Sequence, residues 1–191
     1  MRRAIAAAVF AKHLAPDDIV VCGLGSMRRA WFEVGAPQLT YNASDPMGLG
    51  PALALGLALA RPDRRVVLLE GDGDLVMNLG VLVTIAGAAP ANLRAAVFIN
   101  DRYETGGGQP LPNAGRISYV MLAAGAGWPW TGEAHDEAQA QRLVPALLER
   151  TSLGLLAVHV DAEPSPYPAD PGPTSQSEDR VLFQRRLAGE P

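Results

Sequence analysis

The stretch VVLLEGDGDLVMNLGVLVTIAGAAP, residues 66–90, decides the fold because a buried-strand pattern runs directly into charged and flexible residues. Its first part is apolar and β-branched, as in a strand that is covered on both faces. Asp72 then lies between Gly71 and Gly73, and Asp74 follows at once. A carboxylate buried without a partner is unfavourable. The pattern therefore indicates either a tight turn open to water or a site where the charge has a partner.

The rest of the chain continues this alternation of strands and helices. Short β-branched runs alternate with alanine-rich stretches, which is typical of a parallel sheet with helices on both faces. We therefore predict an α/β fold with a three-layer, open parallel sheet. The expected strands are 19–24, 38–41, 64–70, 93–100 and 153–162, the last of which closes the sheet. The expected helices are 1–16, 48–60, 75–89, 116–126, 136–150 and 177–188.

Length and composition limit the class of protein. The 191 residues suffice for one domain with a sizeable core, which we assign to residues 1–162. Residues 163–191 are expected to form a proline-rich crossing and a last helix. The net charge of -4 argues against a nucleic-acid partner. The apolar run 51–60 is shorter than the roughly 20 residues that span a membrane, so no membrane partner is expected.

The single cysteine, Cys22, excludes an internal disulfide and fits a reducing compartment, so we expect a cytoplasmic protein. A small buried thiol in a strand is the favoured interpretation of this residue. The three histidines, His13, His135 and His159, are scattered through a helix, a polar connection and a strand. We expect each of them to be structural.

Polar residues follow two of the predicted strands at the end where parallel sheets bind ligands. Asp72 follows one strand, and Asn100 with Asp101 follows the next, before the glycine-rich loop 100–115. If the two strands are neighbours, the Asp72 and Asn100 side-chain oxygens point into one crevice. Such oxygens suit Mg²⁺ or Ca²⁺, and Mg²⁺ usually takes further ligands from phosphates and water. The helix opened by Gly73 also has free N–H groups that favour an anion.

Two other interpretations of the glycines remain open at this point. In isolation, GDG is most often a plain β-turn. Gly23 and Gly25 follow a strand, as in a dinucleotide-binding fingerprint, but position 28 is arginine where the third glycine belongs.

The spacing of these pieces resembles that of the thiamine diphosphate (ThDP) enzymes, whose cofactor-binding domain carries GDG and, at a set distance, Asn-Asn. Here GDG is at 71–73 and Asn-Asp at 100–101. The order and spacing of these motifs most resemble those of sulfopyruvate decarboxylase β subunits and of the corresponding half of phosphonopyruvate decarboxylase. The matching pieces are Met47-Gly48-Leu49, GLALARPDRRVVLLEGDGDLVMNLGVLVTIAGAAPANL at 56–93 and ETGGGQP at 104–110. The resemblance covers about residues 19 to 161.

The resemblance implies roles for individual residues. The side chains of Asp72 and Asn100 and the backbone carbonyl of Arg102 would hold Mg²⁺. Met47 would be the apolar wedge beneath ThDP, and it is the one catalytic assignment on this chain. The residues expected to contact the cofactor are Met47, Gly48, Gly71, Gly73, Asp74, Leu75, Thr105, Gly106 and Gly107.

Two residues depart from the family pattern. Asp101 replaces the second asparagine, and Asp74 stands where a small neutral residue is more usual, so both add negative charge near a polyanion. Asp74 could instead serve as a helix N-cap turned away from the phosphates.

The resemblance also implies a partner. The glutamate that activates ThDP lies on a separate pyrimidine-binding domain, and no glutamate here lies in a segment that resembles it. We therefore expect an α subunit, in an α2β2 assembly, and decarboxylation of a small anionic 2-oxo acid at a shared active site. A subunit of an acetolactate-synthase-like carboligase and a non-catalytic interaction module that retains the fold are the alternatives.

Overall fold

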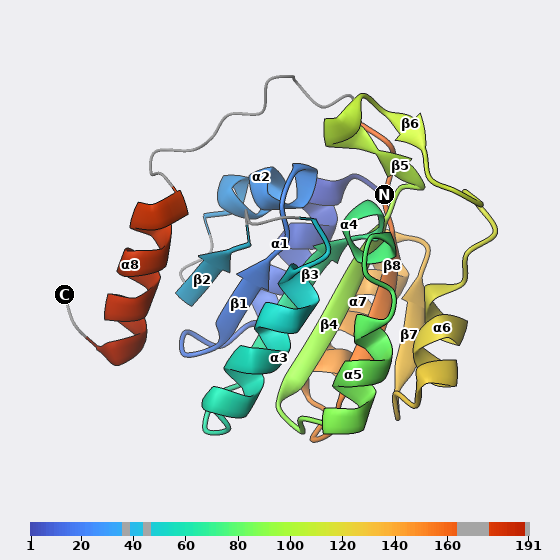
Figure 1. The fold of residues 1–191 in the computed structure, drawn as a ribbon. Coiled ribbons are helices and arrows are strands. Elements are labelled where there is room, and N and C mark those ends of the chain that lie inside the picture. The colour runs from blue at the N-terminus through green and yellow to red at the C-terminus, as the bar shows by residue number, and fades with distance from the viewer. Residues whose placement is uncertain (36–38, 44–46, 164–175, 190–191) are drawn as a thin grey trace.

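The computed structural model describes residues 1–35, 39–43, 47–163 and 176–189. Within these residues, six parallel strands form one sheet in the order β2-β1-β3-β4-β8-β7 (Figure 1). The strands are β1 (Ile19–Cys22), β2 (Leu39–Asn42), β3 (Val66–Gly71), β4 (Leu93–Ile99), β7 (Thr131–Ala134) and β8 (Gly154–His159). A small antiparallel ribbon follows β4 and consists of β5 (Arg102–Tyr103), the 3-10 turn η1 (Glu104–Gly106) and β6 (Gln109–Pro110).

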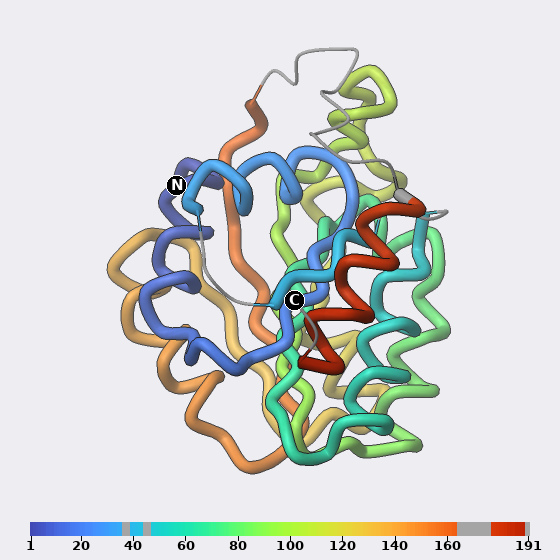
Figure 2. The backbone as a smooth tube through the Cα atoms, turned by 90° about the vertical axis from the view of Figure 1, so that its left-hand side faces the viewer, coloured from blue at the N-terminus to red at the C-terminus, as the bar shows by residue number. Residues whose placement is uncertain are grey.

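Helices cover both faces of the sheet. The front helices are α3 (Gly50–Ala60), α5 (Val81–Ala88) and α6 (Tyr119–Ala126), and the back helices are α1 (Arg3–His13), α2 (Ser26–Glu33) and α7 (Glu137–Leu148). Figure 2, seen from the β2 side, shows the sheet between these two layers. Helix α8 (Gln176–Ala188) packs beside β2, where the Phe183 ring meets the Tyr41 ring edge-on at 5.1 Å.

The period-2 alternation of a strand explains the two cores. In β4, Leu93, Ala95 and Val97 pack under the front helices, whereas Ala96 and Phe98 pack under the back helices. All seven residues of β4 are buried, as expected of a strand covered on both faces. The predicted three-layer α/β sheet is therefore confirmed.

Most predicted elements are present, and Cys22 is fully buried in β1, as expected. The predicted helix 75–89 is wrong as one helix, since α4 (Asp72–Val76) and α5 are separated by a turn. Asn78 lies in this turn, and its side-chain amide donates to the Gly48 carbonyl at 3.0 Å, which ties the turn to the segment before α3. The predicted strand 153–162 does not close the sheet, since β7 lies outside β8.

Strand β7 and helix α2 were not predicted. The proline-rich crossing falls mostly on 164–175, outside the described residues, and the division of the chain at residue 162 stays a prediction. Among the residues that the structure describes, every helix falls short of the length and hydrophobicity of a membrane-spanning segment.

Candidate functional site

A cleft of about 450 Å³, part of it open to solvent, lies at the carboxyl ends of β1, β3 and β4. The strand order reverses between β1 and β3, and such a reversal leaves a crevice where open α/β sheets bind ligands. The cleft is lined by Arg3, Leu24, Gly25, Ser26, Met27, Met47, Gly71, Asp72, Gly73, Asp74, Phe98, Asn100, Arg102, Tyr103, Glu104 and Thr105.

Asp72 is the polar centre of the cleft. It begins α4 directly after β3 and is only 2% exposed. Its Oδ1 accepts the Gly73 N–H at 2.8 Å, and its Oδ2 accepts the N–H groups of Asn100 and Asp101 at 3.0 and 2.7 Å. One carboxylate therefore joins the ends of two neighbouring strands, β3 and β4.

The residues after β4 form a tight turn around that carboxylate. Asn100 Oδ1 accepts the Arg102 N–H at 2.9 Å, and Asp101 has a positive φ of 59°. Asparagine and aspartate are the non-glycine residues most often found in this left-handed conformation, so an aspartate is well suited to position 101. Asp101 contributes its N–H to Asp72, and this bond does not involve its own carboxylate.

The donor set fits a hard divalent cation. A carboxylate has about four acceptor positions, and three N–H groups occupy three of those on Asp72, so its Oδ1 keeps one. Asn100 Oδ1 keeps a second lone pair in the same way. Burial, and to a lesser degree the Asp101 charge, raises the pKa of Asp72 to about 6, against the lowering effect of the N–H bonds. A cation at this place would supply the positive charge that the buried carboxylate lacks.

A second pair of carboxyl groups lies behind Asp72. Glu70, in β3, is fully buried, and burial together with the neighbouring Asp74 raises its pKa well above the ordinary value. Its Oε1 accepts the Gly71 N–H at 3.0 Å, while among the described residues no donor reaches Oε2. Its polar neighbour is Asp74, and the negative charge of Asp74 contributes to the raised pKa of Glu70.

Asp74 is the member of this pair that lines the cleft. Its Oδ1 accepts the Gly48 N–H in a short contact, and it is 6% exposed. The interpretation of Asp74 as a helix N-cap is wrong, because Gly71 holds the N-cap position of α4. Gly48, whose φ is 85°, is thus fixed from both sides, by Asp74 and by Asn78. Met47, the expected wedge, precedes it and lines the cleft with 40% of its surface exposed.

The glycine-rich loop is fastened over the cleft by an ion pair that sequence reasoning missed. Arg3 Nη2 lies 2.6 Å from Glu104 Oε2, and both side chains are under 10% exposed. Glu104 Oε1 accepts the Glu163 N–H at 2.9 Å. Thr105 lines the cleft and packs against Gly25, where an added Cβ would lie 3.0 Å from Thr105 Cγ2.

Of the remaining predicted contacts, Gly73 lines the cleft, whereas Leu75, Gly106 and Gly107 are not among its lining residues. Gly73 lies under the Tyr103 ring, which an added Cβ would approach to 3.0 Å. Leu75 is 2% exposed and belongs to the front core. Gly106 and Gly107 follow Thr105 in the turn η1 and at its C-cap. The signal for Glu70 was a carboxylate at the end of an otherwise apolar strand, whereas no local signal pairs Arg3 with Glu104.

An open parallel sheet with an acidic cleft at its reversal point defines a cofactor-binding α/β domain. The sequence matches the thiamine pyrophosphate enzyme, C-terminal TPP binding domain, over residues 23–158. The chain therefore belongs to the thiamine pyrophosphate enzyme family.

Relatives with curated names agree with this assignment. The β subunit of sulfopyruvate decarboxylase from Methanothermobacter thermautotrophicus is 40% identical over 49% of this chain and 50% of its own length. Phosphonopyruvate decarboxylase from Streptomyces hygroscopicus is 33% identical over 59% of this chain and 28% of its own length. The large subunit of acetolactate synthase isozyme 1 from Escherichia coli is 30% identical over 73% of this chain and 26% of its own length.

The matched part thus spans about half or less of these relatives. Benzoylformate decarboxylase from Polynucleobacter necessarius has the same fold, with a TM-score of 0.74 and 19% identity over 87% of this chain and 34% of that one.

Proposed function

We propose that this chain is the ThDP- and Mg²⁺-binding half of a 2-oxo acid decarboxylase, equivalent to the β subunit of sulfopyruvate decarboxylase. The observation that carries the proposal is the joining of two strand ends by Asp72, with Asn100 beside it, inside a TPP binding domain. The similarity to named sulfopyruvate and phosphonopyruvate decarboxylases supports a small anionic 2-oxo acid as the substrate.

The residues of this chain would bind and orient the cofactor. Asp72 and Asn100, with the backbone carbonyl of Arg102, would hold Mg²⁺. Gly71, Gly73, Asp74, Thr105, Gly106 and Gly107 would surround the diphosphate, although in this structure the Gly73 N–H donates to Asp72 Oδ1. Met47 would support the cofactor from below, held by the Gly48 bonds. When bound, ThDP supplies the reactive carbon and takes up the electron pair that loss of CO₂ releases.

We also propose a separate α subunit, in an α2β2 assembly, that supplies the activating glutamate. The name of the relatives, subunit beta, supports such a partner.

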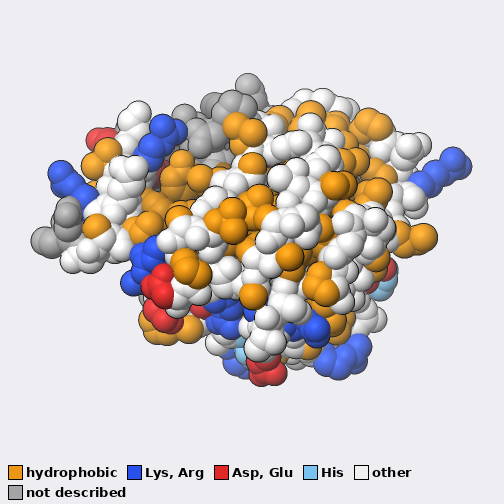
Figure 3. All heavy atoms as spheres, turned by 60° about the horizontal axis from the view of Figure 1, so that its bottom comes forward, with side chains coloured by type: hydrophobic (Ala, Val, Ile, Leu, Met, Phe, Trp, Pro, Cys, Tyr) orange, Lys and Arg blue, Asp and Glu red, His pale blue; other side chains and the backbone are white. Residues whose placement is uncertain are grey.

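The front helices also support a partner subunit, because α3 is apolar on every side, and a helix of that kind is usually buried. Yet Leu59 of α3, Val83 of α5 and Met121 of α6 are 57%, 63% and 74% exposed. On the face seen in Figure 3, hydrophobic side chains spread through the centre, and charged side chains lie mostly at the margins and lower part.

Carboligation is the second candidate, because an acetolactate synthase subunit is 30% identical over 73% of this chain. Product analysis with and without an acceptor 2-oxo acid separates the two reactions. The non-catalytic alternative was motivated by Asp74 and Asp101. The Asp74 carboxylate accepts the Gly48 N–H, which gives it a structural role, whereas Asp101 bonds to Asp72 only through its backbone N–H.

A pair of matched substitutions tests the cofactor site. Asp72→Asn removes the proposed ligand charge, and we expect it to weaken calorimetric binding of ThDP with Mg²⁺ by about 100-fold or more. Asp101→Asn makes the same chemical change one strand away and should leave binding within about threefold. Equal losses in both variants would contradict the assignment.

A second experiment tests the division of labour. The purified chain should release no CO₂ from 2-oxo acids with ThDP and Mg²⁺, and release should begin when the α subunit is added. Turnover by the chain alone would refute the proposed partner.

A further inference from the structure

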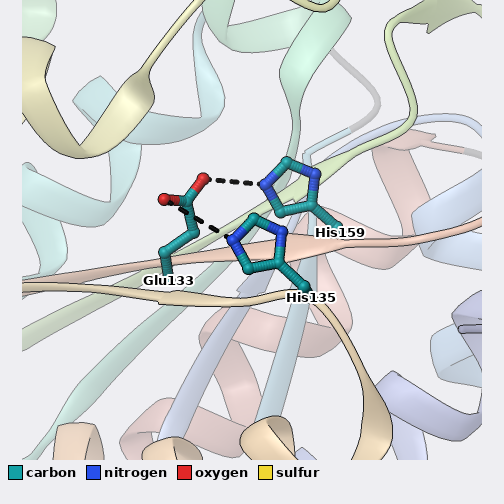
Figure 4. Close-up of side chains that lie close together, drawn as sticks. All are labelled: Glu133, His135 and His159. Carbon is teal, nitrogen blue, oxygen red and sulfur yellow. Dashed lines mark hydrogen bonds and ion pairs between the residues drawn. The ribbon is translucent and has the colours of Figure 1, made fainter.

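Three polar side chains gather at the β7 edge of the sheet, outside the cleft just described. They are Glu133 and His135, on and just after β7, and His159, the last residue of β8. Figure 4 shows both imidazole rings turned toward the same carboxylate. Glu133 Oε1 lies 2.8 Å from His159 Nε2, and Glu133 Oε2 lies 3.8 Å from His135 Nε2.

The strand geometry places these groups together. Glu133 and His135 are two positions apart, so their side chains leave the same face of the sheet. In the parallel register, Glu133 is opposite Ala157, and His159 is two positions beyond Ala157 on its strand. All three side chains therefore lie on one face of two hydrogen-bonded strands. The scaffold is rigid, which favours a preformed site.

The turn after β7 is also fixed. The His135 N–H donates to Gln139 Oε1 at 3.0 Å, and Asp136 caps α7 by accepting the Gln139 N–H at 2.8 Å. The start of α7 thus holds the His135 backbone while its ring stays free to face Glu133.

The ligand chemistry is that of a transition-metal site. One ligand atom from each residue can be chosen so that all three lie within 4.8 Å of one another. In a tetrahedral site with bonds of about 2.1 Å, ligand atoms are about 3.4 Å apart, so small side-chain rotations suffice to close the site. Two imidazoles and one carboxylate suit Zn²⁺.

The two rings also converge on one point. They stack with centroids 4.3 Å apart, and both direct Nε2 toward Glu133. One divalent cation between them could therefore bind both nitrogens and the carboxylate together.

We propose that Glu133, His135 and His159 form a Zn²⁺ site at the β7 edge. The three side chains are 36%, 58% and 35% exposed, so the fourth position of the ion faces solvent and takes water or a small anion. Along the strand direction, the site lies at the carboxyl ends of the strands, as the proposed Mg²⁺ ligands do, because His159 is paired with Ile99, the residue before Asn100. None of the three residues is among the described residues that line the cleft.

Calorimetry with ZnCl₂ on the metal-free chain tests this site. We expect one Zn²⁺ per chain, with the affinity reduced about 100-fold or more by His159→Ala or Glu133→Gln, since even outer-shell changes weaken metal binding 10–100-fold. His135→Ala removes an exposed side chain and should have the same effect without loss of the fold. His13→Ala, at an exposed position of α1, is the matched control and should bind as the wild type does.

Two further measurements give independent readouts. Co²⁺ in place of Zn²⁺ should show the visible absorption of tetrahedral coordination in the wild type but not in His135→Ala. Asp72→Asn should leave the Zn²⁺ titration unchanged, which separates this site from the ThDP site. Zn²⁺ binding by the wild type that is no tighter than that of the His135→Ala, His159→Ala double variant would overturn the proposal.

Discussion

Glu70→Gln removes a titrating group from behind the cofactor site while it keeps the size of the side chain. Burial and the neighbouring Asp74 raise the pKa of the Glu70 carboxyl well above its ordinary value of 4.5. The stability that the bound proton contributes is fully present below pH 4.5 and is lost as the pH rises through the raised pKa of the folded state. Glutamine carries its N–H donors at every pH and can still accept the Gly71 N–H. The variant therefore escapes this loss.

Proton linkage gives the magnitude. Where the folded chain keeps one proton that the unfolded chain has released, the free energy of unfolding of the wild type falls by about 1.4 kcal/mol per pH unit. For each pH unit between 4.5 and the raised pKa of Glu70, Glu70→Gln should therefore gain about 1.4 kcal/mol over the wild type. For a chain of this length, each such unit corresponds to about 3–6 °C in Tm.

Urea unfolding followed by circular dichroism at several pH values measures the difference directly. Glu149→Gln is the matched control, because Glu149 is exposed at the end of α7 and its loss should leave the pH profile unchanged. Parallel profiles for the wild type and Glu70→Gln would mean that Glu70 is already ionised in the folded chain. That result would refute the raised pKa of Glu70.

Three further predictions concern the loop, the last helix and the metal ligand. Arg3→Met should lower the free energy of unfolding by about 3 kcal/mol, because it leaves Glu104 as a buried charge without its partner; adding Glu104→Gln should restore part of the loss in urea titrations. Phe183→Ala should destabilise by about 3 kcal/mol through lost packing against the front core, whereas Val181→Ala, at a side chain that is 47% exposed, should change Tm very little. Because protons compete with a cation for Asp72, whose pKa is about 6, Mg²⁺-dependent ThDP binding should weaken about tenfold per pH unit below that value in calorimetry; a flat profile would argue against Asp72 as the ligand.

The parts of the site that lie on neighbouring parallel strands could be predicted from the sequence. Asp72 and Asn100 each end a strand, and parallel strands end at one edge, so their proximity follows from the pairing of β3 with β4. The break at Asn78 could not be predicted in this way, because hydrophobic periodicity does not register a side chain that bonds to the distant Gly48. Strand β7 was missed because its sequence, TGEA, has one β-branched residue and no apolar alternation.

Contacts between distant segments could not be predicted from the sequence for a related reason. His159 and Glu133 are 26 residues apart, and they meet only because β7 lies outside β8. Without that strand order, the histidines looked scattered. Arg3 and Glu104 are 101 residues apart and lie on elements with no shared pattern. Pairings of this kind depend on the topology, which local propensity does not specify.

The end of β3 concentrates negative charge where the fold can least accommodate it. Glu70, Asp72 and Asp74 are all under 10% exposed within five consecutive positions. Burial raises the pKa of Glu70, and burial also raises the pKa of Asp72 despite the N–H groups that bond to its carboxylate. A sequence selected for stability alone would replace such carboxyls by apolar residues. A ligand that binds only the folded chain adds stability in proportion to the logarithm of its concentration over its Kd. If the proposed cation binds Asp72, the free energy that burial of this carboxylate costs the metal-free chain would be offset by binding of the ion.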